Sequence, residues 1–117
     1  MNTPIAPVDE AGIIAAVQAA RAAREPLAIE GHGSKRAMLR PVQAARSLST
    51  RALSGVTRVR PAELSIRAQA GTPRAEIAAT LAEKGQQLSA ESPYLNGVFG
   101  TSAPPSIGGV VAANLSG

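Results

Sequence analysis

Large aromatic side chains are almost absent from this chain. Only Tyr94 and Phe99 among its 117 residues are aromatic, and none is cysteine. A domain of this size must therefore build a thin core from alanine, valine, isoleucine and leucine, without disulfide bonds. The same shortage removes the rings on which single-stranded nucleic acids stack, so we expect no nucleic-acid partner.

The remaining composition argues against other classes of site. Twelve basic and eight acidic residues give a net charge of +4, and the basic residues are dispersed along the chain. His32 is the only histidine and the chain has no cysteine, so neither a multi-histidine nor a thiolate metal site is expected. The longest apolar run is far shorter than the roughly 20 residues of a membrane span. We expect a soluble, cytoplasmic protein without a transmembrane segment.

Hydrophobic periodicity predicts a helix at residues 10–24, capped by Asp9, with Ile13, Ile14, Val17 and Ala20 on one apolar face. Pro26 ends this helix. Short strands are then predicted at residues 27–30, 48–50, 55–60 and 64–69.

A second helix is predicted after Gly71, with Thr72 as its cap and Pro73 at its first position. Gly85 should end it in a left-handed conformation. The residues predicted to form its buried face are Ile77, Ala78, Leu81 and Ala82. This order of elements indicates an α+β or α/β domain, with a small sheet flanked by two helices.

The first glycine loop, residues 31–35, follows the strand at residues 27–30 and reads Gly31-His32-Gly33-Ser34-Lys35. Glycines let successive backbone amides form a concave site for phosphate, and Ser34 adds a hydroxyl donor. The alternative is a simple tight turn. The spacing matches neither the dinucleotide-binding fingerprint nor the P-loop.

The second glycine loop, residues 106–109, reads Ser106-Ile107-Gly108-Gly109 and opens a run of small residues that reaches Gly117. Its amides are predicted to donate to a pyrophosphate, and the small residues leave room for a flat ligand. The alternative is a close-packed buried helix or strand.

Together, and in this order, the two loops resemble the FAD-binding domain of the p-cresol methylhydroxylase and vanillyl-alcohol oxidase type. The matching segments are residues 29–34, 61–72, 85–88 and 106–117. Residues 31–35, 40–42 and 71–73 are most similar to the glycolate oxidase branch of this family. The resemblance implies an FAD-binding domain that is incomplete at its C-terminus, with a first subdomain at about residues 8–91 and the start of a second flavin-contacting segment at 92–117.

The resemblance also implies a function. Such subunits oxidise 2-hydroxy acids by hydride transfer to FAD, often with a homologous flavin subunit and an iron–sulfur subunit, through which they associate with the inner membrane face. A noncatalytic subunit, in which FAD relays electrons or is structural, and a nonbinding remnant are the alternatives. No catalytic residue is expected within the chain, which alone should be inactive and bind FAD weakly or not at all. The expected FAD-binding residues are Gly31, His32, Gly33, Ser34, Lys35, Ser106, Ile107, Gly108 and Gly109.

Two departures from the family pattern sharpen these expectations. Some relatives attach FAD covalently through a histidine at the end of the first glycine loop, where this chain has Ser34, so we expect noncovalent FAD. Glu30 places a negative charge beside the loop unless it points away or pairs with Lys35 or Arg36. His32 is expected to offer its backbone amide, or else to be simply an exposed loop residue. Tyr94 and Phe99 either shield the flavin edge or serve in packing.

Overall fold

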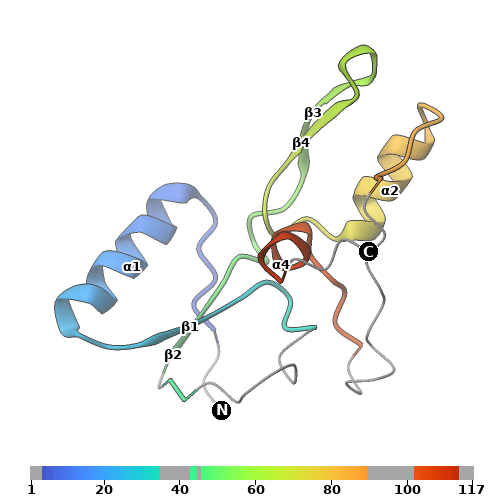
Figure 1. Cartoon of the computed structure of the whole chain (residues 1–117). Helices are drawn as coiled ribbons and strands as arrows, with labels where there is room; N and C mark the ends of the chain where they lie inside the picture. Colours follow the sequence, from blue (N-terminus) through green and yellow to red (C-terminus); the bar gives the residue numbers. More distant parts are fainter. Residues whose placement is uncertain (1–3, 35–42, 45, 90–101, 114–117) are drawn as a thin grey trace.

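The fold combines three α-helices with two small sheets in the described part of the chain, residues 4–34, 43–44, 46–89 and 102–113 of a computed structural model (Figure 1). This confirms a mixed α and β composition. In chain order the elements are α1 (Glu10–Ala23), β1 (Leu27–Glu30), β2 (Arg46–Ser49), β3 (Val56–Arg60), the 3-10 helix η1 (Pro61–Glu63), β4 (Ser65–Ala68), α2 (Arg74–Ala82) and α4 (Ile107–Ala112).

Asp9 caps the start of α1, as predicted, and the helix ends at Ala23, one residue before the predicted end. The Asp9 carboxylate accepts a hydrogen bond from the Gly12 amide at 2.7 Å, and Arg24 ends the helix in the left-handed region at φ 54°. Its apolar face is less buried than predicted. Ala20 is buried, but Ile14 and Val17 are 54% and 44% exposed. No helix among the described residues is long and apolar enough to cross a membrane.

The first sheet pairs β1 with β2 in parallel, from Leu27 opposite Arg46 to Glu30 opposite Ser49. Ile5 bonds to the other edge of β2, donating to the Ser47 carbonyl at 2.8 Å. The observed strand covers residues 46–49, so the predicted strand at residues 48–50 was misplaced toward the C-terminus by one to two residues.

The second sheet is an antiparallel hairpin of β3 and β4 that projects away from α1 (Figure 1). η1 connects its strands, and Leu64 adopts a left-handed conformation at φ 53°. The prediction of a single small sheet was therefore wrong for the described residues, because β1–β2 and β3–β4 are separate.

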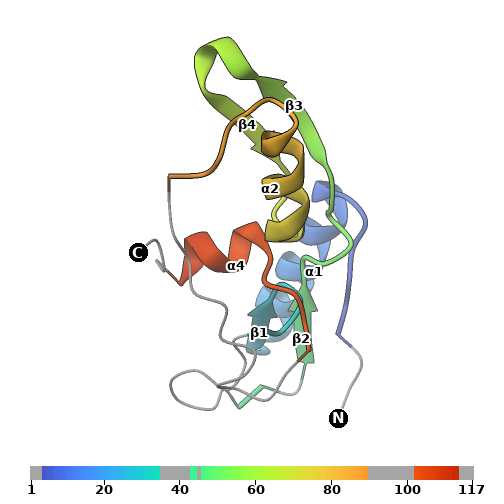
Figure 2. The same ribbon diagram turned by 90° about the vertical axis from the view of Figure 1, so that its right-hand side faces the viewer.

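The start of α2 also differs from the prediction. Pro73 rather than Thr72 is the cap residue, and no side chain caps the helix. Ile77 and Leu81 are buried as predicted, but Ala78 and Ala82 are exposed. The buried face of α2 is a narrow stripe that also includes Arg74. The left-handed Gly85 is confirmed, with φ 65°. Both views place α4 between the β1–β2 sheet and α2 (Figures 1 and 2).

Candidate functional site

The two glycine loops are neighbours in the structure. Gly31 directly follows β1, and a Cβ atom added to it would overlap the hydroxyl oxygen of Ser106. The Ser49 hydroxyl at the end of β2 donates to the Gly31 carbonyl at 2.5 Å. The first glycine loop therefore leaves the sheet in contact with the start of the second, although 75 residues of sequence separate Gly31 from Ser106.

A third segment, the turn at residues 70–72, joins the second glycine loop to the rest of the chain. The Ile107 amide donates to the Thr72 carbonyl at 2.9 Å, and the Gly108 amide donates to the Ala70 carbonyl at 2.8 Å. A Cβ on Gly108 would lie 2.8 Å from that same Ala70 oxygen, so the two backbones are in close contact. Hydrogen bonds from its own backbone amides therefore hold the second glycine loop against the turn at residues 70–72.

Hydrogen bonding of Thr72 explains why this residue does not cap α2. Its side chain is fully buried, and the hydroxyl lies 2.6 Å from the Gln69 carbonyl while accepting from the Gly55 amide at 3.0 Å. The hydroxyl is thus used to close the turn below β4. Capping would require it to face the first turn of the helix instead.

His32 joins the first glycine loop to the same turn. Its Nε2 atom lies 2.8 Å from the Gly71 carbonyl oxygen, and the contact is partly buried. The side chain is therefore not simply that of an exposed loop residue. From the sequence, residues 70–72 were interpreted only as a strand end, a helix cap and a family motif, and their role in holding both loops was missed.

The backbone amides of the first glycine loop are not used within the described part of the chain. Among the described residues, the N–H groups of Gly31 to Ser34 donate to no backbone or side-chain acceptor. Gly33 has φ 80°, a left-handed conformation that glycine adopts without strain. Lys35, also predicted here, lies outside the described residues.

The second glycine loop has a different chemical character. Ser106 is 2% exposed and caps α4, accepting from the Gly109 amide at 3.2 Å. The amides of Ile107, Gly108 and Gly109 therefore all have acceptors within the chain. The alternative of a close-packed helix therefore describes residues 107–109 in this structure, and their predicted use as diphosphate donors stays a prediction. Contact of these residues with a cofactor through other atoms stays a prediction.

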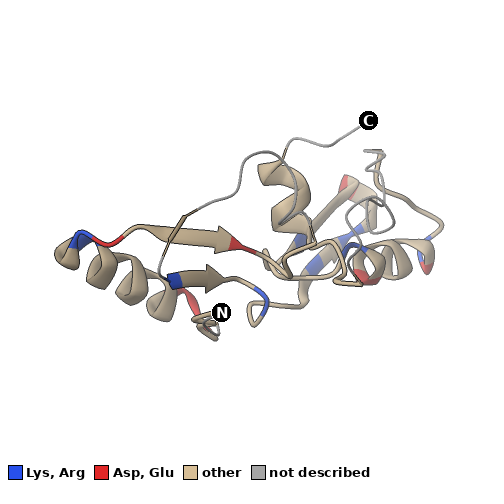
Figure 3. Ribbon diagram, turned by 90° about the horizontal axis from the view of Figure 1, so that it is seen from below, with Lys and Arg blue, Asp and Glu red and all other residues tan. Residues whose placement is uncertain are grey.

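Among the described residues, the charged side chains are spread along the chain (Figure 3). Glu30 ends β1 directly before the first glycine loop, and Arg74 is buried at the start of α2. Lys35 and Arg36, which were predicted as possible partners of Glu30, lie outside the described residues. Tyr94 and Phe99 lie outside them too. Within the described ranges, no group of three or more histidine, cysteine, aspartate or glutamate side chains could hold a metal ion.

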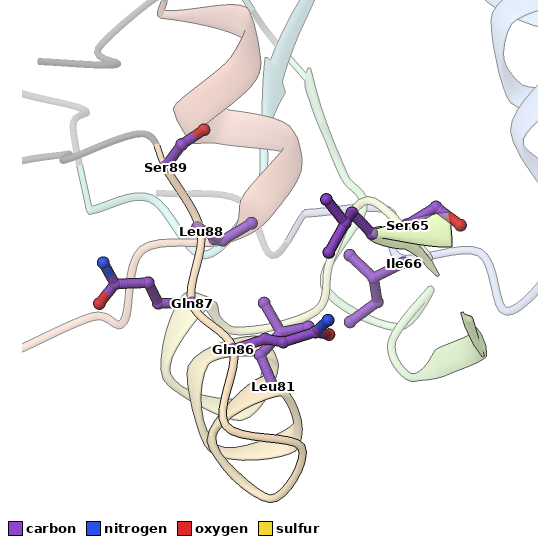
Figure 4. A pocket seen from close by; sticks show the side chains of 8 residues that line it. Ser65, Ile66, Leu81, Gln86, Gln87, Leu88 and Ser89 are labelled. Carbon is purple, nitrogen blue, oxygen red and sulfur yellow. The ribbon is translucent and has the colours of Figure 1, made fainter. Parts of the chain in front are cut away.

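A cavity of about 370 Å³ lies elsewhere, between the hairpin, the end of α2 and the segment that follows it (Figure 4). Its lining is formed by Leu64, Ser65, Ile66, Leu81, Gln86, Gln87, Leu88 and Ser89. None of these residues belongs to either glycine loop. The cavity is therefore distinct from the predicted site.

Comparison with known proteins identifies the family to which the chain belongs. Residues 4–117 match the family described as FAD binding domain. The chain belongs to this family. It is also 38% identical over 94 residues to glycolate oxidase subunit GlcE of Escherichia coli (strain K12), an alignment that covers 80% of this chain and 25% of the relative. The chain thus spans about a quarter of that relative's length. The predicted resemblance to an FAD-binding domain of the glycolate oxidase branch is confirmed.

Proposed function

We propose that the first glycine loop of this FAD-binding domain holds the FAD diphosphate noncovalently. The observation that carries the proposal is the contact between Gly31 and Ser106, which brings together the two loops that resemble flavin-binding segments. In the proposal the amides of residues 31–34 donate to the diphosphate oxygens, Ser34 adds its hydroxyl, and Lys35 adds charge. The second glycine loop forms a closely packed wall beside them.

Noncovalent attachment follows from the residue at the end of the first glycine loop. A serine hydroxyl there is a hydrogen-bond donor and acceptor, whereas the relatives that attach FAD covalently carry a histidine at that position. The only histidine, His32, is directed to the Gly71 carbonyl. We further propose that residues 8–91 and 92–117 belong to different flavin-contacting parts of the domain.

For the reaction, we propose that the chain serves a subunit that oxidises 2-hydroxy acids. FAD supplies a two-electron acceptor, and the protein contributes binding and orientation. Support for this substrate class comes from the similarity to glycolate oxidase subunit GlcE. The proposal includes a homologous flavin subunit and an iron–sulfur subunit as partners. A noncatalytic subunit, in which FAD relays electrons or is structural, is the alternative.

The binding proposal is tested with two glycines that share a conformation but differ in place. Gly33 and Gly85 both have positive φ, and alanine at either position introduces similar backbone strain. We expect Gly33→Ala to weaken FAD binding about tenfold in equilibrium dialysis, because the loop amides lose their orientation. Gly85→Ala should bind FAD as the unchanged chain does. Equal affinities of the two variants would contradict the proposal.

The reaction is tested separately. The polypeptide that carries this chain, loaded with FAD and free of other subunits, is mixed anaerobically with glycolate or lactate while the visible absorbance of oxidised flavin is followed. A catalytic subunit bleaches its own flavin. Persistent absorbance, with bleaching only after a homologous flavin subunit is added, would favour the noncatalytic alternative.

A further inference from the structure

We infer that the His32 side chain is a positioning residue for the cofactor, because it fastens the first glycine loop to the turn at residues 70–72. This inference rests on the proposed function of the loop. It goes beyond the backbone role expected from the sequence. The imidazole need not touch the FAD, because its effect is exerted through the conformation of the amides that flank it.

The geometry fixes the chemistry of the imidazole. The Gly71 carbonyl oxygen accepts hydrogen bonds and cannot donate them, so Nε2 of His32, 2.8 Å away, must carry the hydrogen. This holds for the neutral ring and for the protonated ring alike. The bond therefore requires a donor at the position of Nε2, and not a charge.

The acceptor is well anchored. The Gly71 amide donates to the Leu53 carbonyl at 2.8 Å, and a Cβ on Gly71 would overlap the Thr50 carbonyl oxygen. On either side of Gly71, the carbonyls of Ala70 and Thr72 hold the second glycine loop. A bond to Gly71 thus fixes the first glycine loop relative to the second.

The first glycine loop has little else to hold it. Ser49 fastens Gly31, and beyond Gly31 the His32 bond is the only hydrogen bond from the loop to another described segment. Two glycines flank His32 and give the backbone wide conformational freedom. Loss of the bond should therefore raise the ordering cost that FAD binding must meet.

Two substitutions separate the donor from the imidazole. His32→Gln places an amide N–H at about the position of Nε2, whereas His32→Leu fills similar space without a donor. In a titration with FAD, we expect His32→Leu to weaken binding about fivefold, in line with the net contribution of one hydrogen bond. We expect His32→Gln to restore most of the affinity.

A spectroscopic measurement on the unchanged chain keeps the inference testable if His32→Leu does not fold. His32 is the only histidine, so long-range proton–nitrogen spectra show a single imidazole. We expect an Nε2-bound proton that is protected from exchange with water before any FAD is added. An Nδ1-bound proton, or an Nε2 proton that exchanges freely, would overturn the inference.

The outcomes for FAD distinguish this inference from the function on which it rests. If His32→Leu binds FAD as tightly as the unchanged chain, or if His32→Gln is as weak as His32→Leu, the inference fails while the proposed function stands. If the whole polypeptide that carries this chain, without substitutions, binds no FAD, the proposed function fails whatever the imidazole spectrum shows.

Discussion

At the scale of single residues, close backbone approaches explain the site better than side-chain chemistry does. Gly31 and Gly71 have no room for a Cβ atom, the first because of Ser106 and the second because of the Thr50 and Leu53 carbonyls. The sequence predicts that glycines serve a loop here. It could not predict which neighbour each glycine meets, because those neighbours are between 18 and 75 residues away.

Gly71→Ala tests the close approach directly. The added methyl would meet two carbonyl oxygens that belong to the backbone and cannot turn aside, so we expect the free energy of unfolding to fall by about 2 kcal/mol or more. Gly85→Ala is the control, since its Cβ would meet open space and only the positive φ costs about 1 kcal/mol. Denaturant unfolding of both variants makes the comparison, and a smaller loss for Gly71→Ala would contradict it.

At the scale of elements, local signals succeeded where the cause was local. Asp9 and Arg24 define α1 because capping depends on residues within one turn. The position of β2 could not be predicted, because Ile5 lies more than 40 residues before the strand it bonds to. The prediction that Thr72 caps α2 failed for the same reason, since the contact with Gly55 competes for its hydroxyl.

The hairpin carries an unfavourable pair that can be corrected. Arg58 on β3 lies directly opposite Arg67 on β4, and both side chains are exposed. Arg67→Glu would create a cross-strand pair of opposite charges, so we expect the free energy of unfolding to rise by about 0.5 kcal/mol at low salt, and by less at high salt.

Arg51→Glu makes the same change in net charge at an exposed turn position outside the hairpin. It controls for the reduction of the net charge of +4. Equal stabilisation by Arg51→Glu and Arg67→Glu would show that general repulsion, and not the cross-strand pair, is responsible.

At the scale of the whole molecule, the chain is open. Its Cα radius of gyration is 15.4 Å, compared with about 13 Å for a compact domain of this length. Within the described ranges the buried hydrophobic residues are few and small or aliphatic, as the composition predicts: Ala20, Leu48, Ile77, Leu81 and Val110. The proposed site lies where the β1–β2 sheet, the turn at residues 70–72 and α4 meet, so FAD bound there should stabilise the arrangement of all three.

FAD should therefore stabilise the folded chain. At a free concentration ten times its dissociation constant, FAD is expected to raise the free energy of unfolding by about 1.4 kcal/mol. Riboflavin and adenosine contain the two ends of the cofactor without its diphosphate, and we expect neither to produce this rise. If riboflavin stabilised the chain as much as FAD does, the diphosphate would not be needed for binding, and the first glycine loop would not be the binding site.

The most direct test is a titration of the nitrogen-15-labelled chain with FAD, followed by amide resonances. Such spectra detect weak as well as tight binding, and they report each residue separately. We predict that the largest changes fall on the amides of His32, Gly33 and Ser34, with little change at residues 64–66 and 86–89 around the separate cavity. An unchanged first glycine loop at saturating FAD, or changes centred on that cavity, would contradict the account.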